Sequence, residues 1–393
     1  AEPDARRRAR FAQNHNIPQK HCYESWEGML TEAQLARVAF ICTPDQLHVT
    51  PGLAALERGY DVLLEKPLAP TLAGCRQLVA AADHHGRQLQ VGYVLRYAPF
   101  FQAVKHTIDE GRLGEIMTMS QRENVSYWHM AHSFVRGSWR RREHSSPMIL
   151  SKCSHDLDLL FWYAGAPAAS VASFGSLRHF RPQEAPAEVP QRCTDGCPIE
   201  AECIYSAIDI YVRLTPLINV AKMANKQPLS SLATALQRYP DGVEAAAELI
   251  QPLKQFTEYG DWPVRVVTDD TSREGRLRAI SDRRNPYGRC VYHCDNDVVD
   301  QQHVTIEFQN GITATLIMHG HSFAEGRTLR IDGTKGTLVG QAYHHKQRLV
   351  LHDKRTGQRQ LLVDEGLHLG GDGHGGGDGG LMRAFAQRLR QGD

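Results

Sequence analysis

The sequence lacks two features that mark nucleic-acid-binding and membrane-spanning proteins. Its 45 Lys and Arg residues balance 44 Asp and Glu residues, and a formal charge of +1 gives no global field to attract nucleic acid or an anionic membrane. Its most apolar stretch, residues 159–174, is interrupted by Gly165, Pro167 and Ser170 and falls short of the roughly 20 residues that a spanning helix needs. We therefore expect neither a nucleic-acid partner nor a membrane span.

A secretory segment is also absent. No apolar leader opens the chain, and its nine cysteines are an odd number, which favours a reducing cytoplasm over a disulfide-bonded secreted protein. The chain begins with Ala1 rather than methionine, which indicates a processed chain or a fragment. Its 393 residues, 41% of them hydrophobic, are material for about two domains.

Short apolar runs alternate with longer amphipathic ones between residues 38 and 93. The runs at 38–42, 60–64 and 88–93 are typical of strands, and those at 46–58 and 71–85 are typical of helices. Strands separated by helices of this length pair in parallel through right-handed crossovers. The pattern predicts a Rossmann-like, doubly wound parallel sheet in an α/β fold.

Strands predominate after residue 112, and several are joined by hairpin signals. These signals lie at Asn310-Gly311, around residues 333–336 and around Thr356-Gly357. Successive hairpins build an antiparallel sheet, and helices expected at 148–163 and 381–389 would cover one face of it. The sequence therefore predicts a second, α+β domain with a large, mostly antiparallel open sheet.

We place the domain boundary near residue 98. Residues 1–98 would form a partial dinucleotide-binding domain, and residues 99–393 would form a domain for substrate binding and oligomerisation. Within the second domain, residues 214–260 have a mainly helical pattern and form an insertion to which the sequence assigns no role. The glycine-rich segment at 370–380 is typical of a flexible loop.

The most informative segment is VLLEKP, residues 62–67. An apolar strand delivers Glu65 and Lys66 to its C-terminal end, beside which open α/β sheets bind their ligands. Pro67 biases Lys66 away from the helical region, so the ammonium group would project from a stiff, extended corner, and the Lys66–Pro67 bond can be cis. We expect this lysine to lie where substrate and cofactor meet.

Several motifs in fixed order make the chain resemble the glucose-fructose oxidoreductase, inositol dehydrogenase and rhizopine-catabolism (Gfo/Idh/MocA) family over nearly its whole length. The resemblance implies a dinucleotide-binding domain, a C-terminal α/β domain, and hydride transfer between NAD or NADP and a sugar or cyclitol. The motifs are ICTPDQLHV (41–49), EKP (65–67), VGYVLRYAPF (91–100), GRLGEI (111–116), SHDLDLLFW (154–162) and RIDGTKGTL (330–338).

One expected part of that family is missing. Its members normally begin with a strand and a glycine-rich turn that holds the pyrophosphate, but no GxGxxG occurs here before residue 38. The opening AEPDARRRARFA resembles the point just after the second strand, which implies that the first β-α unit has been lost. On that alignment Glu2 is the ribose-binding carboxylate and favours NAD over NADP, unless it lies in a frayed terminus.

The resemblance assigns the chemistry to Lys66 and His155. A lysine that is partly desolvated near a positively charged nicotinamide should have a lowered pKa, which suits proton exchange with a hydroxyl. His155 matches the family's catalytic histidine, a general base or a group that polarises the substrate oxygen. The alternative is that His155 is a core histidine satisfied by backbone groups.

The residue that orients this histidine departs from the family pattern. Many members carry an aspartate four residues before the histidine, where this chain has Ser151. Lys152 could add a second cation, and Asp156 or Asp158 could replace the missing carboxylate. We prefer Asp158 as the third catalytic residue, because it lies three residues beyond His155 on a similar helix face.

The resemblance also suggests contacts to cofactor and substrate. Thr43 and Pro44 match a turn that packs against the dinucleotide, His48 begins the next helix, and Glu65, like Lys66, matches a position near the nicotinamide ribose. The candidates for substrate contact follow a strand that ends near the cleft or lie in the basic stretch RGSWRRRE, which could equally be a solvated loop. They are Arg96, Tyr97, Trp139 and Arg140.

Five of the nine cysteines lie in two groups. Cys193, Cys197 and Cys203 are spaced closely enough to hold a structural zinc, with a fourth ligand from Cys290, Cys294 or His293. The spacing is not the usual C-x2-C of zinc ribbons, so unligated thiols and disulfides stay open as alternatives.

These features together predict an NAD(P)-dependent dehydrogenase that acts on a sugar-like or cyclitol-like polyol. Two other functions fit the same scaffold. One is a noncatalytic regulator that binds dinucleotide and sugar; the other is an NAD-dependent glycosidase, which the altered Ser151 position keeps open. The resemblance further implies a homo-oligomer, because an exposed sheet face often pairs subunits in this family.

Overall fold

The computed structural model describes residues 1–223, 229–239, 259–366 and 374–391. The chain divides into two compact units. The first contains Ala1–Val94 together with the residues from Gly380 onward, and the second contains Leu95–Gly379. The second unit therefore starts slightly before the boundary placed from the sequence, and the end of the chain belongs to the first unit.

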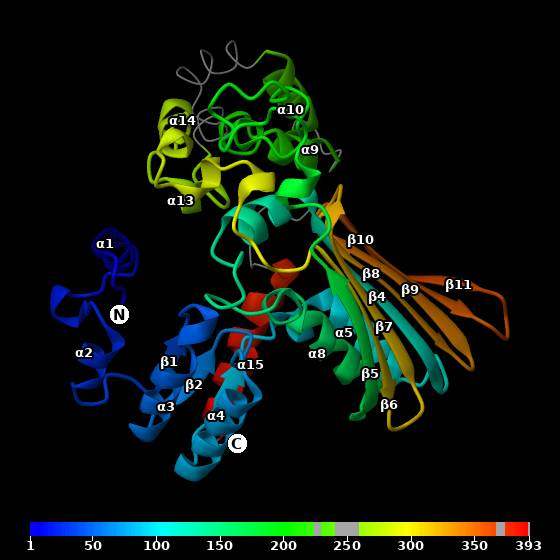
Figure 1. The fold of residues 1–393 in the computed structure, drawn as a ribbon. Helices are drawn as coiled ribbons and strands as arrows, with labels where there is room; N and C mark the ends of the chain where they lie inside the picture. The colour runs from blue at the N-terminus through cyan, green and yellow to red at the C-terminus, as the bar shows by residue number, and fades with distance from the viewer. Residues whose placement is uncertain (224–228, 240–258, 367–373, 392–393) are drawn as a thin grey trace. The chain divides into compact units, whose positions relative to one another are not determined.

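The first unit contains the predicted β-α-β-α-β arrangement. Its strands β1 (Val38–Ile41), β2 (Asp61–Leu64) and β3 (Leu89–Val91) pair in parallel in that order. The helices α3 (Val49–Glu57) and α4 (Leu72–His85) connect them (Figure 1). Helix α3 begins later than expected, because residues 45–47 form a 3-10 turn.

Packing and capping explain why these segments fold as they do. Leu56, Val62, Leu64 and Leu78 are fully buried in one core between strands and helices. The Thr71 hydroxyl caps α4 by accepting a hydrogen bond from Gly74 N, and the helix ends at a glycine with φ of +59°. The shorter helices α1 (Ala5–Asn14) and α2 (Trp26–Leu30) precede this core.

The last helix corrects one expectation. Helix α15 (Gly377–Gln391) was expected to cover the large sheet, but from Gly380 onward it belongs to the first unit. Leu381 and Phe385 are buried, and Arg388 Nη1 donates to Gln90 Oε1 of β3 at 3.0 Å. The helix is therefore part of the first unit from Gly380 onward.

The second unit is built on an eight-stranded sheet with the order β11-β10-β9-β8-β4-β7-β6-β5. All neighbours are antiparallel except β4 and β7. The three predicted hairpins are present, and the first turns at Gly311 with φ of +85°. The strands are β4 (Ile116–Ser126), β5 (Ala168–Ser176), β6 (Gln301–Phe308), β7 (Thr313–Ser322), β8 (Gly326–Gly333), β9 (Gly336–Tyr343), β10 (Lys346–Asp353) and β11 (Arg359–Gly366).

Helices α5 (Pro99–Asp109) and α8 (Ser154–Ala164) lie against this sheet (Figure 1). The single helix expected at 148–163 is in fact two, α7 (Met148–Ser151) and α8. The chain leaves helical geometry at Cys153, with φ of −94° and ψ of 5°. The Lys152 side chain, next to this break, reaches two buried carboxylates, which gives the irregular backbone a polar anchor.

The expected insertion is helical where the structure describes it. Helices α9 (Thr215–Met223) and α10 (Leu229–Arg238) fall within 214–260, while residues 224–228 and 240–258 lie outside the described part. The expected glycine-rich loop is corrected at its end, since residues from Gly377 onward are helical; its residues 370–373 are not described. The remaining helical segments are α6 (Tyr127–His129), π-helical turns at Met130–Arg136 and Ile208–Arg213, α13 (Val264–Val267) and α14 (Arg273–Ser281). Among the described residues, no helix has both the length and the apolar character that crossing a membrane requires.

Candidate active site

A buried histidine joins the two strand-end loops of the first unit. His48 is 1% exposed, its Nδ1 lies 2.8 Å from the carbonyl oxygen of Pro67, and its Nε2 lies 2.8 Å from that of Thr43. Thr43 and Pro44 follow β1, and Pro67 follows β2. Because carbonyl oxygens only accept hydrogen bonds, the ring donates to one loop when neutral and to both when protonated. His48, which was predicted to lie near the cofactor, thus holds the loop after β1 and the loop after β2 together.

The EKP corner is held by backbone contacts. Glu65 N donates to Ile41 O at 2.9 Å, which extends the β1–β2 pairing, and Lys66 N donates to Glu65 Oε2 at 3.2 Å. The Glu65 side chain is exposed, Lys66 is half-buried, and the Lys66–Pro67 bond is cis. Lys66 therefore projects from an ordered corner at the carboxyl edge of the sheet, where ligands of such sheets bind.

A glycine after the third strand keeps this edge open. Gly92 N donates to Leu64 O at 2.8 Å, and a Cβ on Gly92 would lie only 3.2 Å from Glu65 Oε2. Any larger residue would press on the Glu65 carboxylate. The ends of all three strands thus meet at residues 43–44, 65–67 and 92.

The N-terminal residue predicted to bind ribose has local partners. Glu2 N donates to Tyr23 O at 3.0 Å, and Glu2 Oε1 accepts from Asp4 N at 2.9 Å. Asp4 in turn caps α1 by accepting from Arg7 N at 2.8 Å. Glu2 is therefore part of an ordered turn rather than a frayed end, and its contact with a ribose stays a prediction.

In the second unit, His155 lies in the first turn of α8 and is 5% exposed. Its ring centroid is 6.1 Å from that of His374. Ser151 belongs to α7, so the break at Lys152–Cys153 separates it from His155. The spacing of one turn in a continuous helix, on which the family comparison rested, does not apply here.

Asp158 has a partner that the sequence did not predict. Its two carboxylate oxygens accept hydrogen bonds from Arg96 Nε and Nη2, both at 2.7 Å. Arg96 Cζ also lies 5.6 Å from the centroid of the Trp162 ring, and Tyr97 belongs to the same 3-10 turn as Arg96. Burial raises the pKa of Asp158, and the Arg96 hydrogen bonds oppose this rise. Arg96 and Asp158, predicted for separate roles, therefore form one bidentate ion pair.

A buried ion network lies beneath the start of α8. Its members are Glu123, Lys152, Asp156, Glu325 and Arg327. Lys152 Nζ lies 3.3 Å from Glu123 Oε1 and 2.8 Å from Glu325 Oε1. Arg327 pairs with Glu123 at 2.6 Å and with Asp156 at 2.9 Å. The network ties the α7–α8 break, and so the backbone of His155, to β4 and β8.

Two neighbours complete the ion network. Gln121 Nε2 donates to Asp156 Oδ1 at 2.6 Å, and His129 Nδ1 lies 3.0 Å from Glu325 Oε1. Gln121 and Glu123 are alternate residues of β4 that both face inward. Alternate polar residues inside an otherwise strand-like segment were the signal that could have revealed this network from the sequence.

The charges of the ion network do not balance without a proton. Glu123, Asp156 and Glu325 face the cations Lys152 and Arg327, and protonated His129 would add a third cation. Burial raises the pKa of Glu123 to about 7, against the opposing effect of Arg327 and Lys152. Burial also acts on Glu325, but His129 and Lys152 outweigh it and hold the pKa of that carboxyl well below its usual range. Of these two carboxyls, Glu123 is therefore the one that takes up a proton more readily.

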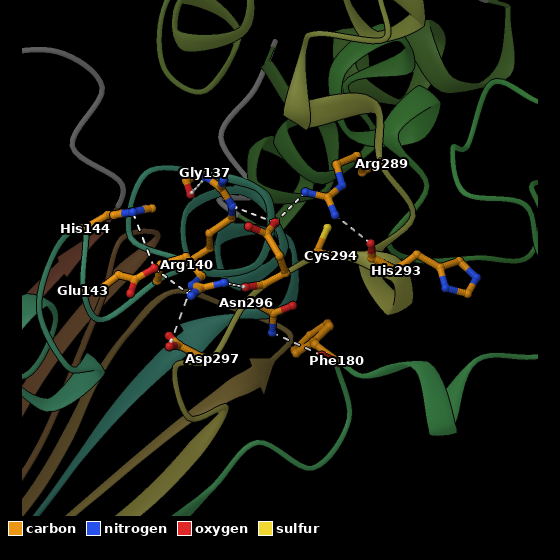
Figure 2. A network of polar contacts seen from close by, with 12 residues as sticks. Gly137, Arg140, Glu143, His144, Phe180, Arg289, His293, Cys294, Asn296 and Asp297 are labelled. Atoms are coloured by element: carbon orange, nitrogen blue, oxygen red, sulfur yellow. Dashed lines mark hydrogen bonds and ion pairs between the residues drawn. The ribbon is translucent and has the colours of Figure 1, made fainter.

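The basic stretch proposed for substrate contact is largely committed to internal pairs (Figure 2). Arg140 Nε lies 3.0 Å from Asp295 Oδ1, and Arg140 Nη1 donates to Gly137 O at 3.2 Å. Burial raises the pKa of Asp295, but hydrogen bonds from Arg140 and Arg289 outweigh it and hold that pKa well below the usual range. Trp139 is 38% exposed, so its ring is accessible for new contacts. The Arg140 guanidinium, in contrast, is already engaged in internal pairs.

The cysteines are free thiols, none of which forms a disulfide. The three that were predicted to bind zinc, Cys193, Cys197 and Cys203, line one small pocket together with Cys290. Within the described ranges, no group of three or more His, Cys, Asp or Glu side chains has the arrangement of a formed metal site. A bound zinc is thus not shown by this geometry.

Comparison with known proteins gives two family matches. Residues 1–93 match the model "Oxidoreductase family, NAD-binding Rossmann fold", and residues 105–211 match "Oxidoreductase family, C-terminal alpha/beta domain". The chain is 22% identical to the Bacillus subtilis protein YteT over 352 residues, which are 85% of this chain and 70% of YteT. It is 32% identical to inositol 2-dehydrogenase of Streptomyces avermitilis over 155 residues, 37% of this chain and 42% of that enzyme. The match thus spans less than half the length of the latter relative.

Solved structures share the fold. One is levoglucosan dehydrogenase in complex with NADH and levoglucosan, with a TM-score of 0.58 and 16% sequence identity over 100% of this chain and 80% of that one. At this identity the likeness concerns the fold alone. It agrees with the predicted pairing of a nucleotide-binding unit and a large-sheet unit.

Proposed function

Because the chain belongs to the Gfo/Idh/MocA oxidoreductase family, we propose that it transfers a hydride between NAD(H) and a hydroxyl group of a sugar-like or cyclitol-like polyol. The relatives support this substrate class, since they include an inositol 2-dehydrogenase and a levoglucosan dehydrogenase. NAD is the cofactor of choice because the matched family model is NAD-binding and the latter enzyme was solved with NADH. The observation that carries the proposal is the ordered EKP corner at the carboxyl edge of the parallel sheet.

The edge of the first unit fits a dinucleotide. The exposed Glu65 carboxylate suits a ribose hydroxyl, and Gly92 keeps side-chain atoms away from it. Thr43 and Pro44 would pack against the cofactor on the β1 side, while Glu2 would bond the other ribose. When bound, the nicotinamide supplies the hydride acceptor or donor.

Lys66 and His155 would then act on the substrate. In oxidation the hydroxyl O–H proton passes to a base while the hydride leaves the same carbon, so the base must accept a hydrogen bond from that hydroxyl. His155 suits the role of base, and the Lys66 ammonium would donate to the substrate oxygen and stabilise its negative charge. The ion network would hold the His155 backbone in place, whereas Arg96 and Asp158 would position the neighbouring turn as a pair.

The test uses the full-length gene product, NAD and a panel of inositols, aldoses and anhydrosugars. We expect NADH to form with at least one polyol, and Lys66→Met to abolish this while NAD still binds. Nucleotide and sugar binding without NADH formation from any polyol would favour a regulator. Release of the aglycone from aryl glycosides with no net NADH would favour the glycosidase.

We also propose a homo-oligomer in a reducing compartment. Phe174 of the edge strand β5 is 82% exposed and pairs with the exposed His303 of β6, so it offers an apolar side chain that a second copy would cover. The nine free thiols suit the cytoplasm. Phe174→Glu should reduce the mass measured by light scattering, and an unchanged mass would reject this face as the interface.

A further inference from the structure

Backbone pairing brings two cysteines that are far apart in the sequence onto one face of a short antiparallel pair. Arg192 and Arg289 form an isolated antiparallel bridge, in which Cys193 N donates to Gly288 O at 3.0 Å and Cys290 N donates to Gln191 O at 2.9 Å. Cys193 and Cys290 are therefore diagonal neighbours across this bridge, with both side chains on the same face. Both residues are less than one tenth exposed.

The loop after Cys193 brings two more thiols to the same place. Asp195 N donates to Arg192 O at 3.2 Å, and the chain turns at Gly196 with φ of +76°, a conformation that favours glycine. A second turn, closed by Cys203 N donating to Ile199 O at 2.9 Å, returns the chain. Cys193, Cys197, Cys203 and Cys290 all line one pocket of about 10 Å³, which is room for one water-sized sphere.

A buried cation faces this pocket. Arg136, the last residue of the π-helical turn, is 0% exposed and lines the same pocket. Its Nε donates to Arg289 O and its Nη2 to Tyr205 O, both at 2.7 Å, and Nη2 also lies 3.7 Å from Cys193 Sγ. Its Nη1 is buried without a hydrogen-bond partner, and no carboxylate pairs with it among the residues that the structure describes. A buried guanidinium is destabilising unless negative charge lies nearby.

We propose that Cys193, Cys197, Cys203 and Cys290 bind one zinc ion as four thiolates, with Arg136 as the charge partner of the site. Binding releases four protons, so the site carries two negative charges, of which the guanidinium offsets one. Four thiolates bind zinc at about 2.3 Å, so the four side chains that line the pocket would have to turn toward one centre, an arrangement that the described residues do not yet have. The spacing of these cysteines is not a standard iron–sulfur motif, which favours a single metal ion.

The structure chooses among the three candidates for the fourth ligand. Cys294 Sγ donates to Cys290 O at 3.3 Å and does not line the pocket, and His293 Nε2 lies 3.4 Å from Val189 O. Figure 2 places Cys294 beside Arg289, whose Nη2 donates to the His293 carbonyl oxygen at 2.8 Å. Cys290 is therefore the fourth ligand, and Cys294 is a matched control.

The proposed zinc site would stabilise the basic stretch of residues 136–143, which contains the substrate-contact candidate Trp139. It joins the Cys193–Cys203 loop and the Arg289–Cys290 segment to Arg136, and three residues after Arg136 comes Trp139. Loss of the metal would leave the Arg136 charge unbalanced and loosen the basic stretch. The role is structural, since four protein ligands leave no open position for substrate.

The test is metal analysis of the full-length protein, purified without chelators from zinc-supplied cells. We expect about one zinc per chain, and cobalt exchanged into the site should give the thiolate charge-transfer and visible bands of tetrahedral sulfur coordination. Cys290→Ser and Cys203→Ser should lower bound zinc at least fivefold, while Cys294→Ser should keep it. These readouts do not depend on enzyme activity, so they can fail while the dehydrogenase proposal stands, and the reverse.

Three results would overturn the proposal. The first is wild-type protein with less than about 0.2 zinc per chain and no cobalt spectrum. The second is iron with acid-labile sulfide in place of zinc. The third is equal zinc loss in Cys294→Ser and Cys290→Ser. If the serine variants do not fold, stepwise mercurial titration of the wild type decides instead, since zinc must be released as four of the nine thiols react.

Discussion

Replacing Glu123 by Gln should remove a large part of the pH dependence of stability of the second unit. Glu123 is 0% exposed, and although Arg327 lies 2.6 Å and Lys152 3.3 Å away, neither carboxylate oxygen accepts a well-aligned hydrogen bond. The hydrogen bonds that a charged Glu123 would make with water are therefore not fully replaced, and the nearby carboxylates of Asp156 and Glu325 repel its charge. Burial raises its pKa from about 4.5 to about 7.

The direction follows from proton linkage. Because the folded state holds the Glu123 proton more tightly than the unfolded state, its contribution to stability is complete below about pH 4.5 and is lost as the pH rises to about 7. A difference of about 2.5 in pKa corresponds to about 3 kcal/mol, which is an order-of-magnitude value. Glutamine resembles the protonated acid at every pH, so E123Q should match the wild type near pH 5 and exceed its stability by up to about 3 kcal/mol at pH 8.

The assay is urea unfolding of both proteins between pH 5 and pH 8, with midpoints and slopes compared at each pH. Other titrating groups are shared and cancel in the difference between the two curves. Glu307→Gln, which changes an exposed glutamate of β6, is the control and should follow the wild type throughout. A difference between E123Q and wild type that stays constant over this range, or that falls toward pH 8, would refute the raised pKa.

Three other changes test the remaining parts of the site. Lys66→Met should lower kcat for the best polyol by a factor of at least about 100 and change the Kd for NAD by less than about threefold; loss of NAD binding alone would move Lys66 to the cofactor site. His155→Gln should lower kcat by a similar factor and flatten the acid limb of the pH profile, and a retained limb would rule it out as the base. A double-mutant cycle with Arg96→Gln and Asp158→Asn should give a coupling of about 1 kcal/mol in urea unfolding, and zero coupling would dismiss the ion pair as a stabilising contact.

The parts of the fold that follow local rules could be predicted from the sequence. The three parallel strands and the Asn310-Gly311 hairpin each carry their signal within a few residues, as alternating apolar runs or turn residues. The break between α7 and α8 could not, because it depends on where the Lys152 ammonium finds carboxylates from β4 and from the β7–β8 connection. Long-range ion pairing overrides helical periodicity there.

The candidate site shows the same division. Glu65, Lys66 and His155 could be named because they lie in motifs shared with a family. The Arg96–Asp158 pair joins residues 62 positions apart, and the His48 contacts join two loops through backbone carbonyls, which leave no mark in a sequence. The three-dimensional structure is needed to see that His48 supports the EKP corner, whereas the sequence indicated only that it begins a helix.

The return of α15 to the first unit has a consequence for how the protein is made. Gln90 and its partner Arg388 are separated by the entire second unit, so the ribosome must synthesise Leu95–Gly379 before the contact can form. Until then, the first unit lacks its residues from Gly380 onward and is more open to chaperones and proteases. A chain whose synthesis stops within the large sheet would thus have an incomplete first unit. The first unit can be completed only after the whole second unit has been synthesised.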